Sequence, residues 1–196
     1  GDGLSHVFNF RVNDFELGEE VRAGQPSRLD LEEPQEVNVT FDVAALLEAV
    51  PTPQTKQIQG SRLDAKPFWH LEKSRIGESR LVPVEVVVNG QVVATKNIEA
   101  DGMLNSLAFD VQLERSSWVA VRILPSVHTN PIFVHIADQP IYASRKSAEW
   151  CRKSVDVCWE KKSPRIRSEE LDAAREAYDF ARAYYEEAMQ NAKVEE

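Results

Sequence analysis

The stretch SSWVAVRILPSVHTNPIFV, residues 116–134, indicates the architecture of this chain most directly. An apolar run over 117–124 leads into a polar segment with two prolines, and a second apolar run begins at Ile132. Short runs rich in β-branched residues and bounded by turn residues are typical of strands. The polar segment holds His128 and Asn130, but no second metal ligand and no nucleophile–base pair. The stretch predicts two strands joined by an exposed polar turn.

The same pattern continues toward the N-terminus. We expect strands over residues 5–12, 35–43, 81–88, 91–98, 104–113, 117–124 and 132–136. Asn89-Gly90 separates two of these runs, and Asn-Gly is the strongest short hairpin signal because both turn positions need a positive φ. Residues 48–67 read as a long irregular connection. Since no strand alternates with a helix, we predict a mainly β fold, an antiparallel immunoglobulin-like β-sandwich over residues 1–143.

Residues 144–196 change to a helical period. Leu171, Ala174, Tyr178, Ala181, Tyr185 and Ala188 recur at steps of three and four, and Ser168 is the expected N-cap. Residues 145–160 predict a preceding helix with Cys151 and Cys158 near one stripe. The segment 144–167 has eight basic and three acidic residues, whereas 168–196 has three basic and nine acidic. We therefore predict a C-terminal helical hairpin, packed on the sandwich.

Composition excludes some partners. The net charge is −9, which argues against a duplex-binding surface, so no nucleic-acid partner is expected. The longest apolar runs fall far short of the roughly 18 residues that a membrane span needs. Residues 1–4 show no signal-peptide pattern.

The residue types that carry chemistry do not gather into any known motif. The four histidines, His6, His70, His128 and His135, form neither His-x-His nor His-Glu-x-x-His. The sequence contains no Gly-x-Ser-x-Gly and no glycine loop that could cradle a phosphate. We therefore expect no metal, no cofactor and no catalytic residue in this chain.

The segment from Phe68 to Gly77 is the densest in aromatic and charged residues. One interpretation is a contact surface for another domain or a ligand, and the other is a strand with core aromatics and solvated charges. The interface or ligand candidates, including the two from the 116–134 stretch, are Trp69, His70, Glu72, Lys73, Arg75, His128 and Asn130.

Cys151 and Cys158 allow two interpretations. On one continuous helix, seven residues separate their Cα atoms by about 10 Å, which is too far for a disulfide. A bend near Ser154-Val155-Asp156 would make a bridge possible.

Several of these runs together carry a resemblance. Residues 69–77, 82–90, 116–134 and 143–151, with Val155-Asp156 and Cys158-Trp159, resemble the C-terminal region of bacterial CehA/McbA-type metallohydrolases of the PHP superfamily. The resemblance implies a catalytic metal-binding barrel that is N-terminal to this region, and no ligand motif of that barrel occurs here. It also implies a periplasmic or secreted protein, which favours the Cys151–Cys158 disulfide.

The resemblance and the missing motifs lead to one expectation and one alternative. The expectation is a non-catalytic accessory domain that packs against, or positions, the N-terminal catalytic domain of its parent hydrolase. The alternative is a free-standing module that binds carbohydrate or another small ligand through exposed aromatics. Trp118 is expected in the core, and Trp150 and Trp159 in the hairpin, which leaves Trp69 for such a ligand.

Overall fold

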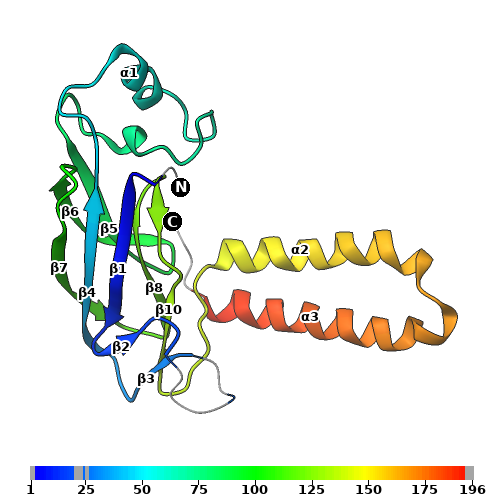
Figure 1. Cartoon of the computed structure of the whole chain (residues 1–196). Helices are drawn as coiled ribbons and strands as arrows, with labels where there is room; N and C mark the ends of the chain where they lie inside the picture. The colour runs from blue at the N-terminus through cyan, green and yellow to red at the C-terminus, as the bar shows by residue number, and fades with distance from the viewer. Residues whose placement is uncertain (1–2, 20–23, 25–26, 193–196) are drawn as a thin grey trace. The chain divides into compact units, whose positions relative to one another are not determined.

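Two β-sheets packed face to face form the N-terminal part of the molecule (Figure 1). The computed structural model describes residues 3–19, 24 and 27–192. The chain divides into two compact units, Gly1–Ile141 and Tyr142–Glu196. The first unit is a β-sandwich and the second a pair of helices, as the sequence predicted. Residues 1–2 and 193–196, which the predicted domain bounds include, lie outside the described residues.

The first sheet is antiparallel throughout. Its strand order is β2 (Phe15–Glu16), β1 (Ser5–Val12), β4 (Gln35–Ala45) and β7 (Asn105–Leu113). On β4 the residues Val37, Val39, Phe41 and Val43 are buried, and the residues between them face outward. This alternation is the period of two that predicted the strand.

The second sheet covers the other side of the core. Its order is β3 (Leu29–Leu31), β10 (Ile132–Ile136), β8 (Ser117–Ile123), β5 (Leu81–Val88) and β6 (Gln91–Glu99), and β9 (Val127–His128) also pairs with β8. The core joins alternate residues of both sheets, such as Val84, Val121 and Val134 with Val39 and Leu113.

The predicted Asn89-Gly90 turn is confirmed. Val88 pairs with Gln91 across it, and both turn residues have positive φ, 51° at Asn89 and 88° at Gly90. The Asn89 side chain accepts a hydrogen bond from the Trp118 backbone N–H (3.1 Å), so the turn is also attached to the neighbouring strand β8.

Several elements differ from the prediction, among them the two-residue strand β9 in the segment expected as an exposed turn. β3 was not predicted, and it pairs with β10 in parallel rather than antiparallel. The connection over 48–67 is not wholly irregular, because it contains helix α1 (Pro53–Gln59), which Figure 1 shows beyond the ends of the strands. A reciprocal pair of hydrogen bonds between Thr52 and Thr55, with Pro53 in the first turn, begins this helix. Residues 68–77 contain a 3₁₀ helix, η1 (Leu71–Ser74), instead of a strand.

The second unit consists of α2 (Arg145–Lys162) and α3 (Leu171–Asn191), which run side by side (Figure 1). Two short 3₁₀ helices, η2 (Ser163–Arg165) and η3 (Ser168–Glu170), connect them. Every residue of the predicted α3 stripe is buried or half-buried. Ser168 is not the N-cap of α3, because it lies in η3 and the helix begins after Glu170. The packing of the hairpin on the sandwich stays a prediction.

The disulfide favoured from the sequence is absent from the structure. Helix α2 continues through Ser154-Val155-Asp156 without a bend, and Cys151 and Cys158 are both free thiols. Ser154 does not break the helix because its hydroxyl donates to the Trp150 carbonyl one turn earlier (2.9 Å), a bond that is compatible with a helix interior. The alternative of one continuous helix is therefore the correct one.

Candidate functional site

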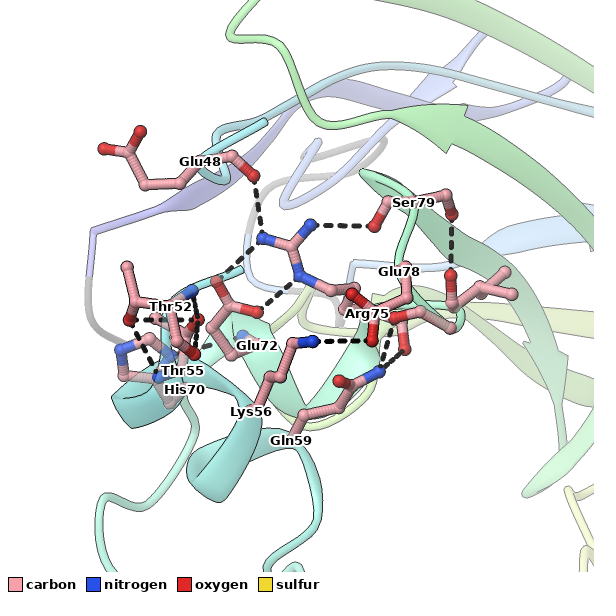
Figure 2. Close-up of polar contacts among 12 residues, drawn as sticks. Glu48, Thr52, Thr55, Lys56, Gln59, His70, Glu72, Arg75, Glu78 and Ser79 are labelled. Carbon is pink, nitrogen blue, oxygen red and sulfur yellow. Dashed lines mark hydrogen bonds and ion pairs between the residues drawn. The ribbon is translucent and has the colours of Figure 1, made fainter. Parts of the chain in front are cut away.

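Two of the predicted contact residues form a buried ion pair instead. Arg75 donates two hydrogen bonds to the Glu72 carboxylate, at 2.6 and 2.9 Å, and only 4% and 2% of these two residues is exposed (Figure 2). Arg75 also donates to the carbonyls of Glu48 and Ser79. The bonds to Glu72 raise the pKa of Arg75. The prediction of a contact role for Glu72 and Arg75 is wrong, since neither side chain reaches the surface.

The neighbouring candidates Lys73 and His70 also bind this part of the chain together. Lys73 Nζ donates to the carbonyls of Arg62, Leu63 and Ala65, at 2.7, 3.3 and 2.6 Å. His70 precedes η1, and its Nδ1 accepts from the Glu72 backbone N–H (3.2 Å, Figure 2). Both residues therefore stabilise the loop over 60–75, which carries Trp69 at a positive φ of 56°.

The other candidates, His128 and Asn130, line an open hollow on the outer face of the second sheet. Its volume is about 460 Å³. Apolar side chains make up most of its wall, among them those of Trp118, Leu124, Pro125, Val127, Pro131 and Phe133. Alternation produces this wall, because the residues next to Trp118 on β8, Ser117 and Val119, point into the sandwich.

The polar edge of this hollow is held firmly. Thr129 donates its backbone N–H to the Val121 carbonyl (2.9 Å), and its hydroxyl accepts from the Val121 N–H (3.1 Å). His128 Nδ1 lies 3.1 Å from the Thr129 carbonyl. Arg122, also in the wall, pairs with Glu85 at 2.6 Å. The hollow is thus preformed, with an apolar floor and an aligned polar edge.

A second hollow, of about 490 Å³, brings Trp69 to the same region. Its lining includes His6, Trp69, Pro125, Ser126 and His128. Trp69 is 61% exposed, and Ser126 forms a 2.6 Å hydrogen bond with Ser5 at the base. His128 therefore shares the first hollow with Asn130 and the second with Trp69, whereas Glu72, Lys73 and Arg75 line neither hollow and stabilise the fold.

The sequence interpretation missed Trp118 and Phe133. Trp118 was expected in the core, but it is half-buried on the outer face. The signal was present in the alternation of β8, since Val119, Val121 and Ile123 form one face and Trp118 belongs to the other. Phe133 follows the same rule on β10, between Ile132 and Val134.

His135 lies on the same outer face, and its side chain has an unusual environment. It points away from Val134 and Ile136, as alternation along a strand requires, and its Nδ1 is buried with no hydrogen-bond partner among the described residues. Burial, and then the nearby Arg28 charge, lower the pKa of His135. Across the described ranges, no three side chains of His, Cys, Asp or Glu gather in a way that could hold a metal ion.

The two outer faces of the sandwich differ in chemistry. The first sheet presents polar pairs such as Asn38–Asp110 (2.7 Å) and Asp42–Ser106 (2.6 Å). The second sheet presents the apolar hollow. None of the helices in the described part of the chain has the length and apolar character needed to cross a membrane. Comparison of the chain with models of protein families, with curated proteins and with solved structures gave no match.

Proposed function

We propose that the β-sandwich is a non-catalytic interaction module whose second sheet binds a partner protein domain through the hollow at Trp118, His128 and Phe133. This proposal rests on the difference in chemistry between the outer faces of the two sheets. A large apolar wall with aromatic side chains and a fixed polar edge has the composition of a protein interface core, whereas the outer face of the first sheet carries hydrogen-bonded polar pairs beside the exposed Phe8.

We further propose the identity of the partner. The resemblance of residues 69–77, 82–90 and 116–134 to the C-terminal region of CehA/McbA-type metallohydrolases makes the partner the metal-dependent catalytic domain of an exported, PHP-type parent protein. The role of this chain would be to support and position that domain. The last of these three runs also builds the hollow, so the resemblance and the candidate interface involve the same part of the sheet.

A hydrogen-exchange experiment tests the interface. The amides of residues 117–133 should exchange more slowly in the full product of the natural reading frame than in this chain alone. Phe133→Ser should remove that protection and weaken the binding of the partner. Val92→Ser is the matched control, because Val92 is exposed to the same extent (43%) but lies on β6, at the far edge of the sheet. Equal exchange in both proteins would refute this function.

A second candidate function rests on Trp69. Its exposed ring lies beside His6 and His128 in the second hollow, and an exposed aromatic ring next to polar groups is a common carbohydrate site. A screen of soluble glycans by thermal shift distinguishes the two functions. Stabilisation by a glycan that Trp69→Ala abolishes and Trp118→Ala retains would favour carbohydrate binding over a partner domain.

A further inference from the structure

The helical unit exposes large apolar side chains that its own two-helix packing does not use. Trp150 and Val157 on α2 are 70% and 50% exposed, and Phe180 and Tyr184 on α3 are 75% and 49% exposed. The contact between the helices uses other residues. Trp159 and Tyr178 pack with their ring centroids 5.0 Å apart, and the small Ala148 and Ala188 are buried toward the other end of the two helices.

All four exposed side chains turn away from one charged side of the hairpin. That side is marked by the ion pairs of Arg152 with Glu186 (2.9 Å) and Asp156 with Arg182 (2.8 Å). Residues two apart on an α-helix point in nearly opposite directions. Trp150 is two residues from Arg152, and Phe180 and Tyr184 are each two residues from Arg182. The apolar residues of α2 and α3 therefore share the side opposite the ion pairs.

The two helices bring opposite charges to this shared side. We call Trp150, Lys153, Val157 and Lys161 the lysine stripe, and Glu176, Phe180, Tyr184 and Glu187 the glutamate stripe. Lys161 lines a shallow hollow with Trp150 and Val157. Neither Lys161 nor Glu176 belongs to an ion pair within the part of the chain that the structure describes.

The stripe residues of the two helices also lie at corresponding positions along the helix axis. Asp156 is level with Arg182, and the helices run in opposite directions. Val157 is then level with Ala181, next to Phe180, and Lys161 is level with Ala177, next to Glu176. A two-fold axis parallel to the helices preserves these levels while it places the lysine stripe of one copy against the glutamate stripe of the other. The apolar pair Val157–Phe180 and the charged pair Lys161–Glu176 are then each formed twice.

We propose that a second copy of this chain covers this side of the hairpin, and that the two hairpins form a symmetric antiparallel four-helix bundle. The proposal is independent of the function of the sandwich face, since it uses no residue of the first unit. Charge complementarity selects a second copy over an unrelated partner. One chain contains both the lysine stripe and the glutamate stripe, at corresponding positions along the two helices.

Sedimentation of the full chain tests the dimer by charge reversal. Lys161→Glu places two carboxylates opposite each other across the interface, and Glu176→Lys places two lysines together. Each variant alone should dimerise about tenfold more weakly than the unmodified chain, or worse. An equimolar mixture of the two variants should recover dimers, because every charged pair is again of opposite sign. The double variant should recover them without mixing.

Two further variants separate the interface from folding. Phe180→Glu should give a monomer with an unchanged helical circular dichroism spectrum, and Val50→Glu, at a 77% exposed position of the sandwich, should leave the dimer intact. The proposal is overturned by a monomeric unmodified chain, including one whose stripes are covered by its own sandwich. It is equally overturned by a dimer that Phe180→Glu and the charge reversals leave unchanged.

Discussion

The Glu72–Arg75 pair shows how burial changes the importance of a single ion pair. Exposed pairs contribute little to stability because water already solvates both charges. The removal of one partner from a buried pair leaves the other charge without solvent or counter-charge. The loss of one partner should therefore destabilise the fold much more at the buried Glu72–Arg75 pair than at a Glu–Arg pair on the surface.

We predict that Arg75→Met destabilises the sandwich by about 3–5 kcal/mol, because it leaves the Glu72 carboxylate and two carbonyls unpaired. The control is Arg62→Met, which breaks the exposed pair with Asp64 and should leave the free energy of unfolding almost unchanged. Urea unfolding of both variants measures the difference. Similar costs for the two substitutions would show that the pair at 72 and 75 is not buried in solution.

His135 predicts a pH dependence. Its pKa is lowered in the folded state, so below about pH 6.5 the unfolded chain takes up a proton that the folded chain does not. The free energy of unfolding should therefore fall as the pH drops below that value, by at most about 1.4 kcal/mol per pH unit from this residue. In His135→Gln this contribution should vanish, whereas in His128→Gln, at an exposed position, it should persist. Parallel pH profiles for the unmodified chain and His135→Gln would contradict the assignment.

At the scale of elements, the long strands and helices were predictable from the sequence, and the short elements β3 and α1 were not. The strands of the core follow from alternation, and α3 follows from its stripe, because both patterns record which side chains are buried. β3 has only three residues, too few for a period, and its parallel partner is distant in sequence. The capping pair Thr52–Thr55 was readable in the sequence, but α1 has no buried residue and so no apolar pattern.

The candidate site was predictable in part, for the same reason. His128 and Asn130 stand out as polar residues in an apolar stretch, and they do line the hollow. The segment around Trp69 was recognised as unusual, but its charged residues turn inward. Which of two neighbouring charges is buried depends on distant groups, such as the Glu48 carbonyl that accepts from Arg75, and a local pattern does not contain that information.

The β5–β6 turn gives a prediction at this scale. Gly90→Val should destabilise the sandwich by on the order of 1 kcal/mol or more, because a β-branched residue tolerates the φ of 88° poorly. Space is not the obstacle, since an added Cβ would lie 4.0 Å from the Trp118 ring. Gly90→Asn, which accepts positive φ, should cost much less. If thermal unfolding shows Gly90→Asn to be as destabilising as Gly90→Val, the cause would be lost packing and not backbone strain.

At the scale of the whole molecule, each unit has one face whose polar groups pair within the unit and one face with exposed apolar side chains. In the sandwich, the first sheet pairs its outward polar groups among themselves, and the second sheet leaves an apolar hollow. In the helical unit, ion pairs occupy one side and large apolar residues the other. Under the two proposals these faces have different partners, a catalytic domain for the sandwich and a second copy of the chain for the helical unit.

The parallel strand β3 has a consequence for the solubility of the chain. Without it, β10 would end the sheet, and its sequence Ile-Phe-Val-His-Ile is uncharged and rich in residues that favour intermolecular strand pairing. β3 covers that row of backbone groups with only three residues, and Asp30 at its centre places a negative charge on the new edge. Short, charged edges of this kind discourage another chain from adding a strand. The three-residue strand β3, which the sequence did not predict, thus gives the sheet an edge of the kind that resists aggregation.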